Sequence, residues 1–91
     1  MRYRVKENIL WKIVDLEAVI VDPGREEYYF LNPTGTDIWE MMSMGRSFDE
    51  IRGELCGRYE VSPGEAEKDL RDLTSELKER GLIEEETSDG K

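Results

Sequence analysis

The apolar residues in the first third of the chain fall in three short runs that are typical of β-strands. The runs span residues 9–14, 18–21 and 28–31, and they are rich in Ile, Val, Trp, Tyr and Phe. Only a few polar residues separate them. The pair Pro23-Gly24 suits a tight turn, because proline presets φ and glycine accepts positive φ. The pattern predicts an antiparallel meander of three strands.

After Leu31 the apolar spacing changes from that of a strand to that of a helix. Asn32 can cap a first helix that begins at Pro33, and Gly45 ends it. Residues 47–50, Ser-Phe-Asp-Glu, have the spacing of a capping box, in which the serine and the glutamate satisfy each other's free amides. We therefore predict a second helix that begins there.

A second capping box, Ser-Pro-Gly-Glu at residues 62–65, predicts a third helix. Its buried stripe is formed by Ala66, Leu70, Leu73 and Leu77. Gly81 can adopt the left-handed conformation that often ends a helix. We predict one domain over residues 1–83, and a disordered acidic tail over residues 84–91, which have nothing to bury. The predicted fold is α+β and winged-helix-like, with a three-stranded meander followed by three helices.

Charge and composition exclude several classes of function. The 91 residues include 22 acidic side chains, 13 basic ones and no histidine, for a formal net charge of −9. Such a chain repels phosphate, so nucleic acid and anionic membranes are poor partners. Metal centres need converging His, Cys or carboxylate ligands, and we expect no metal and no cofactor. With no signal peptide, no long apolar run and a single cysteine, we expect a cytoplasmic protein.

Cys56 is the one side chain that would be considered as a nucleophile. It lies on the second predicted helix beside the core residue Leu55, and the chain has no histidine to activate its thiolate. We therefore predict an inert, packed thiol and no catalytic residue.

The second and third helices are joined by a short link, as in a helix-turn-helix that binds DNA. The first turns of the third helix, however, would present Glu65, Glu67 and Asp69 to the groove of the DNA. A winged helix that binds DNA and a purely scaffolding domain remain as alternatives.

Residues 28–31 form the last strand of the meander and leave one of its edges unpaired. Unpaired N–H and C=O groups are a template for an added strand, either from a peptide or from a second copy of the chain in a homodimer. No proline or lysine in the run Tyr28-Tyr29-Phe30 blocks such pairing, so the edge is either covered by another part of the fold or reserved for a partner. Alternation places Tyr29 and Leu31 on one face of the sheet, and Tyr28 and Phe30 on the other.

Several motifs along the chain occur in an order that resembles the PqqD family. They are Tyr-Tyr-x-Leu-Asn-Pro-Thr-Gly-x-x-Ile-Trp (residues 28–39), Gly45 with Ser47-x-x-Glu50-Ile51, Tyr59-x-Val61, Asp69-Leu70-x-x-Leu73-x-x-x-Leu77, and Gly81-Leu82-Ile83. This is the pyrroloquinoline quinone biosynthesis protein D group, also described as the leader-peptide recognition element of ribosomally synthesised, post-translationally modified peptides. The resemblance covers residues 9–83.

The resemblance implies a small non-catalytic peptide chaperone. Such a protein binds the leader of a precursor peptide as a fourth strand, in a groove closed by the last helix, and presents it to a modifying enzyme, often a radical S-adenosylmethionine protein. The implied leader-binding residues are Tyr28, Tyr29, Phe30, Leu31, Asp69, Leu73 and Glu76. The flank of the third helix that faces the groove stays open, because Thr74 and Lys78 lie on the other side of its apolar stripe.

The added strand predicts the effect of a proline substitution. Tyr29→Pro should abolish leader binding, because proline lacks the N–H that a paired strand needs. If the Tyr29 N–H instead points to the second strand, Phe30→Pro is the better choice.

Overall fold

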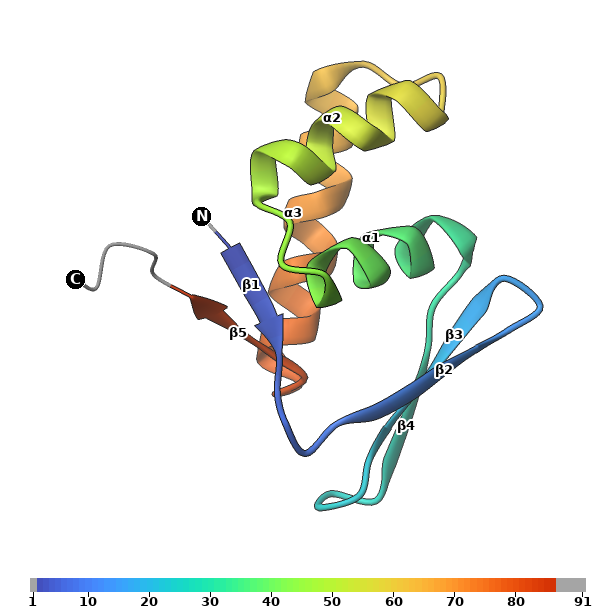
Figure 1. The fold of residues 1–91 in the computed structure, drawn as a ribbon, viewed down its shortest axis with the longest axis vertical. Helices are drawn as coiled ribbons and strands as arrows, with labels where there is room; N and C mark the ends of the chain where they lie inside the picture. Colours follow the sequence, from blue (N-terminus) through green and yellow to red (C-terminus); the bar gives the residue numbers. More distant parts are fainter. Residues whose placement is uncertain (1, 87–91) are drawn as a thin grey trace.

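The computed structural model describes residues 2–86 and consists of two small sheets and three helices (Figure 1). The elements in chain order are β1 (Arg2–Val5), β2 (Leu10–Val14), β3 (Glu17–Asp22), β4 (Glu27–Phe30), α1 (Pro33–Ser43), α2 (Phe48–Arg58), α3 (Pro63–Glu79) and β5 (Ile83–Glu86). The predicted α+β organisation, a three-stranded meander followed by three helices, is confirmed. The winged-helix comparison stays a prediction.

The meander has the strand order β2-β3-β4, so β4 lies at one edge. In the central strand, Ile20 pairs with Trp11 on one side and with Tyr29 on the other. Ile20 is fully buried because this face of the sheet packs against the core, and α1 contacts β3. The alternation predicted for β4 is present, since Tyr29 is half-buried while Tyr28 and Phe30 are exposed.

A second, two-stranded sheet was not predicted from the sequence. β1 pairs antiparallel with β5, which places Val5 opposite Ile83 and Arg4 opposite Glu84. The prediction of a disordered tail is therefore wrong for residues 84–86. These residues gain backbone pairing and an ion pair between Glu84 and Arg4. The rest of the predicted tail, residues 87–91, lies outside the described residues.

The helix starts follow the predicted capping chemistry. The Asn32 side chain accepts a hydrogen bond from the Gly35 N–H at 2.7 Å, and both predicted capping boxes are formed. After α3, Gly81 takes a φ of +76°, and the Leu82 N–H donates to the Leu77 carbonyl at 3.0 Å. The largest fully buried side chains come from β3, all three helices and β5: Ile20, Ile38, Trp39, Met42, Ile51, Leu70, Leu77 and Ile83.

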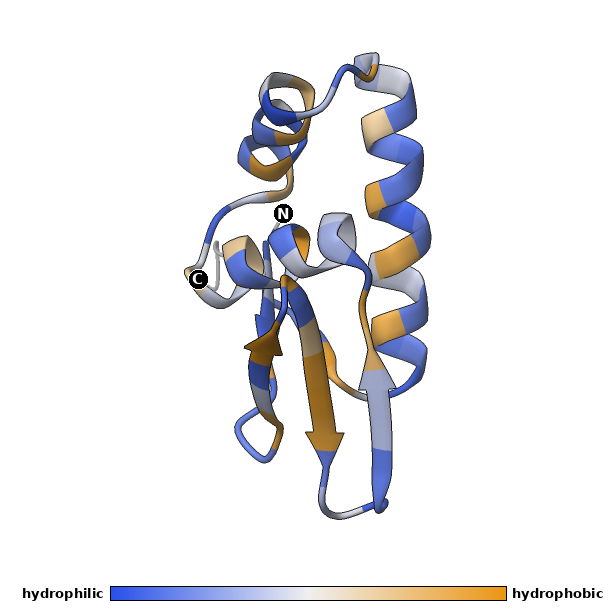
Figure 2. Cartoon of the chain, turned by 90° about the vertical axis from the view of Figure 1, so that its right-hand side faces the viewer, coloured by the Kyte–Doolittle hydropathy of each residue, from blue (hydrophilic) through white to orange (hydrophobic). Residues whose placement is uncertain are grey.

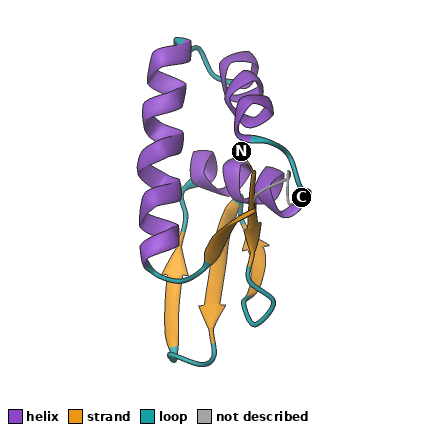
Figure 3. Cartoon of the chain, turned by 90° about the vertical axis from the view of Figure 1, so that its left-hand side faces the viewer, coloured by secondary structure: helices purple, strands orange, loops and turns teal. Residues whose placement is uncertain are grey.

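The position of α3 matters for the site. The helix runs along one side of the molecule, and its C-terminal half lies on the same side as the edge strand β4 (Figures 2 and 3). Apolar residues of α3 recur along the side turned towards the other elements (Figure 2). No helix of the described chain is long and apolar enough to cross a membrane.

Candidate functional site: the groove between β4 and α3

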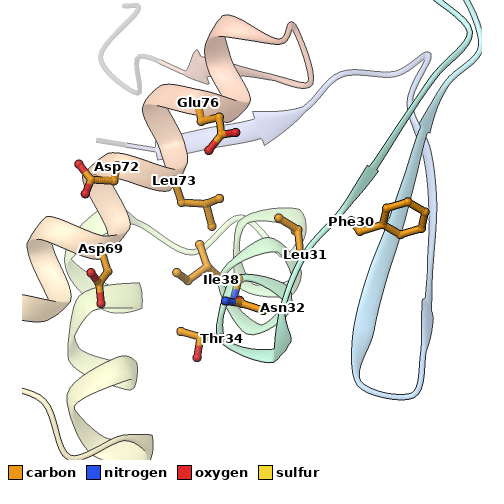
Figure 4. Close-up of a pocket in the computed structure, with 10 residues that line it drawn as sticks. Phe30, Leu31, Asn32, Thr34, Ile38, Asp69, Asp72, Leu73 and Glu76 are labelled. Carbon is orange, nitrogen blue, oxygen red and sulfur yellow. The ribbon is translucent and has the colours of Figure 1, made fainter.

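A groove with a volume of about 460 Å³ lies between the edge of β4 and one flank of α3 (Figure 4). Its walls come from three parts of the chain. They are Phe30 and Leu31 at the end of β4, Asn32, Thr34, Gly35 and Ile38 at the start of α1, and Asp69, Asp72, Leu73 and Glu76 on α3. The groove thus joins segments that lie about forty residues apart in the sequence.

The backbone of β4 turns alternate hydrogen-bonding groups towards this groove. The Leu31 N–H donates to the Ala18 carbonyl of β3 at 3.0 Å. Because amides in an antiparallel strand point alternately to either side, the Tyr29 N–H also faces β3. The N–H and C=O groups of Tyr28 and Phe30 face outward instead. Among residues 2–86, β4 pairs with no strand other than β3, so these outward groups form a free edge.

The floor of the groove is fixed by a side chain that sequence reasoning missed. The Thr36 hydroxyl, which is 3% exposed, accepts from the Ala18 N–H at 2.7 Å and donates to the Leu31 carbonyl at 3.4 Å. The hydroxyl therefore stands between two backbone groups that would otherwise pair directly across β3 and the end of β4. This arrangement holds the buried Leu31 against the start of α1. The sequence carries no signal for it, since a threonine in the first turn of a helix is common.

The question of which α3 flank faces the groove is settled by burial and ion pairs. Asp69, Leu73 and Glu76 line the groove. Thr74, on the other flank, is buried and donates to the Leu70 carbonyl at 2.9 Å, while Lys78 forms an ion pair with β5. The groove flank is therefore the acidic one.

Asp72 also lines the groove, and it was not among the predicted site residues. Its spacing of three residues from Asp69 and four from Glu76 could have identified it. Residues at this spacing share one helix face.

The structure brings five of the seven predicted site residues to the groove, but Phe30 only borders it, with its exposed ring turned away from α3 (Figure 4), and the side chains of Tyr28 and Tyr29 lie elsewhere. The Tyr29 ring packs under the guanidinium of Arg80, 4.6 Å from its centroid. Burial, followed by interaction with the Glu76 carboxylate, raises the pKa of Tyr29. The Tyr28 side chain is 68% exposed on the outer face of the sheet. Tyr28 thus contributes its backbone N–H and C=O to the free edge, whereas the backbone groups of Tyr29 face β3.

The groove combines features suited to binding an extended peptide. It has a free strand edge along one wall, apolar side chains in its floor (Leu31, Ile38 and Leu73) and carboxylates along the other wall. Among residues 2–86 no group of three His, Cys, Asp or Glu side chains could hold a metal ion. The groups that line the groove can offer a ligand main-chain hydrogen bonds, apolar contacts and charge.

Cys56 lies away from this groove, half-buried on α2 and packed against the core. We expect Cys56→Ser to change peptide affinity by less than about twofold, because Cys56 is not among the residues that line the groove. Fluorescence anisotropy with a labelled peptide measures the affinity, and thermal melting measures any loss of stability. A folded Cys56→Ser protein that no longer binds would contradict this prediction.

Comparison with known proteins identifies the group to which the chain belongs. The family model for Coenzyme PQQ synthesis protein D (PqqD) matches residues 17–83, well over half of the sequence. The chain belongs to the PqqD family. The family resemblance read from the motifs is thereby confirmed. No curated protein matches the sequence.

Two solved structures are similar to this PqqD-family chain over almost their whole lengths. One, described as TbiB1 in complex with the TbiA(beta) leader peptide, is 26% identical, with a TM-score of 0.87 over 93% of this chain and 99% of its own. The other, a lasso peptide synthetase B1 complexed with the leader peptide, is 29% identical, with a TM-score of 0.86 over 93% of this chain and 100% of its own. Both of these proteins were solved with a leader peptide bound.

Proposed function

We propose that this PqqD-family protein is a non-catalytic adaptor for a ribosomally made precursor peptide. The leader of the precursor adds to the free edge of β4 as a fourth, antiparallel strand and lies in the groove against α3. The remainder of the precursor is thereby presented to a modifying enzyme, for which we propose a radical S-adenosylmethionine protein. The observation that carries this function is the free edge of β4 beside a groove with an apolar floor. The two similar structures, each bound to a leader peptide, support it.

The energetics of this mode are adequate for a transient complex. Main-chain hydrogen bonds along the edge add about 0.5–1.5 kcal/mol each and depend little on sequence. Burying a leucine or isoleucine of the leader against Leu31, Ile38 and Leu73 adds about 1.5–3 kcal/mol. After the ordering cost of a flexible peptide, we expect an affinity of about 1 μM, or roughly −8 kcal/mol. Selectivity must then come from the side chains that line the groove.

A backbone amide titration tests the proposed function. The ligand is a synthetic leader taken from a short precursor peptide encoded beside the gene, and the control is the same peptide with two central residues changed to proline. We expect shifts concentrated in residues 27–32 and 69–76, and loss of binding for the proline peptide. Shifts confined to residues 47–59, with β4 unaffected, would overturn strand addition.

The charges of α3 disfavour the DNA-binding alternative. Each basic residue of the helix is paired with a carboxylate: Lys68 with Asp72 at 3.1 Å, Arg71 with Glu67 at 3.0 Å, and Lys78 with Glu85 at 3.3 Å. Phosphate binding would have to break these pairs against a net charge of −9.

We therefore expect no measurable binding to a short labelled duplex, even at low salt. Anisotropy at several salt concentrations measures this. Tight binding that weakens steeply as salt rises would restore the DNA-binding alternative.

A further inference from the structure

The wall of the groove that α3 provides carries a row of carboxylates. Asp69, Asp72 and Glu76 follow one another on a single face of the helix, with the apolar Leu73 among them, and all four line the groove (Figure 4). The three carboxylates are exposed. A peptide lying between β4 and α3 must therefore pass along this row.

The negative charge of the row is compensated unevenly. Lys68 pairs with Asp72 at 3.1 Å, and Arg80 pairs with Glu76 at 3.4 Å, although neither cation lines the groove. Asp69 forms no ion pair within 4 Å with any residue between 2 and 86, although Lys68, which is bonded to Asp72, also interacts weakly with its charge. Uncompensated negative charge is thus greatest at the Asp69 end, which lies towards Thr34 and away from Glu76 in Figure 4.

The start of α1, which borders the same end of the groove, does not offset this charge. A helix N-terminus attracts anions through its free N–H groups. Here the Asn32 side chain accepts from the Gly35 N–H at 2.7 Å, and the Asn32 carbonyl accepts from the Thr36 N–H at 2.8 Å. Pro33 has no N–H. Little of the helix terminus is therefore left to hold a carboxylate of a ligand.

We propose that the groove selects leaders by charge: a lysine or arginine of the leader pairs with Asp69 where the leader passes the start of α1. This inference rests on the proposed function and specifies its substrate. β4 runs from Glu27 towards α1, so an antiparallel leader reaches the Asp69 end first. The basic residue accordingly lies on the N-terminal side of the leader residues that pair with β4.

The expected size of this effect follows from the exposure of the groove. An ion pair in contact with solvent changes affinity by about two- to fivefold and weakens as salt rises. Strand pairing and apolar burial therefore supply most of the affinity. The basic residue distinguishes between leaders that make the same strand pairing and the same apolar contacts.

A selection from random peptides tests the inference and needs no cognate leader. Short peptides of random sequence, displayed on their messenger RNA, are selected for binding to the full chain and, in parallel, to Asp69→Lys. The matched control is Glu7→Lys, which makes the same change in net charge in the turn before β2, at the opposite edge of the sheet. Circular dichroism checks that each variant is folded.

The outcomes separate this inference from the proposed function. We expect the parent protein and Glu7→Lys to enrich peptides with Lys or Arg on the N-terminal side of an apolar segment. We expect Asp69→Lys to enrich peptides with acidic residues at that position. Two outcomes would overturn charge selection and leave the proposed function standing. In one, the enriched peptides show no preference for Lys or Arg at that position. In the other, Asp69→Lys enriches the same basic peptides as the parent protein. No enriched peptide at all would overturn the proposed function as well.

A quantitative version uses one selected peptide and its Lys→Glu derivative. Anisotropy should show about a two- to fivefold or larger loss of affinity for the Glu peptide with the parent protein, and recovery of that loss with Asp69→Lys. Equal affinities of the two peptides for the parent protein would overturn the pairing with Asp69.

Discussion

Phe30→Pro abolishes peptide binding and leaves the protein folded, whereas Tyr29→Pro destabilises the fold: this is the result that we expect from the direction of the amides in β4. The Leu31 N–H donates to Ala18 in β3, so the Tyr29 N–H also faces β3 and the Phe30 N–H faces the groove. A proline at position 30 removes a donor from the free edge, where edge strands tolerate proline, and blocks the added strand. We expect at least about a tenfold loss of affinity.

The neighbouring substitution provides the matched comparison. Tyr29→Pro leaves the Ile20 carbonyl without its donor inside the sheet, which costs about 1–3 kcal/mol before any clash of the ring. Thermal melting should therefore separate the two variants, with Phe30→Pro close to the parent protein. Anisotropy with a labelled leader measures binding. Retained binding by a folded Phe30→Pro protein would contradict strand addition at this edge.

The choice between these two prolines shows what the sequence can predict. The strand itself follows from the aromatic run of residues 28–31, because β-propensity and alternation are local properties. The direction of the Tyr29 amide instead depends on the register between β3 and β4, which a single strand does not specify. The sequence therefore predicted the edge strand, but it did not specify whether proline at position 29 or at position 30 would block the added strand.

The same distinction explains the small sheet of β1 and β5. Its strands join residues 2–5 to residues 83–86, across almost the whole described chain. The acidic run after Ile83 has no apolar alternation, so its local pattern predicts disorder. The pairing becomes favourable through contacts that are not local, such as Arg4 with Glu84 and Val5 with Ile83. By contrast, the capping boxes are local and were predicted correctly.

The groove itself was predictable in part. The spacing of Asp69, Leu73 and Glu76 placed them on one flank of α3, but the direction of that flank depends on how the helix packs against α2 and β5. The opposite flank could not be assigned from sequence, since the burial of Thr74 and the pairing of Lys78 with Glu85 arise only in the folded chain.

The second large effect is expected at Thr36, whose hydroxyl joins the end of β4 to β3. Thr36→Val keeps the shape of the side chain and removes the hydroxyl. The Ala18 N–H, bonded at 2.7 Å, then loses its acceptor in the interior, and the Leu31 carbonyl loses a longer bond of 3.4 Å. Buried groups left without partners cost about 1–3 kcal/mol each. We expect the free energy of unfolding to fall by about 2–4 kcal/mol, a large share of the total for a small protein.

Thr36→Ser is the matched control, because it keeps the hydroxyl and loses only a methyl group. Chemical denaturation should place its free energy of unfolding much closer to that of the parent protein than to that of Thr36→Val. Leu31 supplies part of the groove floor and is held by this hydroxyl, so Thr36→Val should also weaken leader binding in the fraction that remains folded. Equal stabilities for the valine and serine variants would show that the hydroxyl bridge does not hold the end of β4 in place.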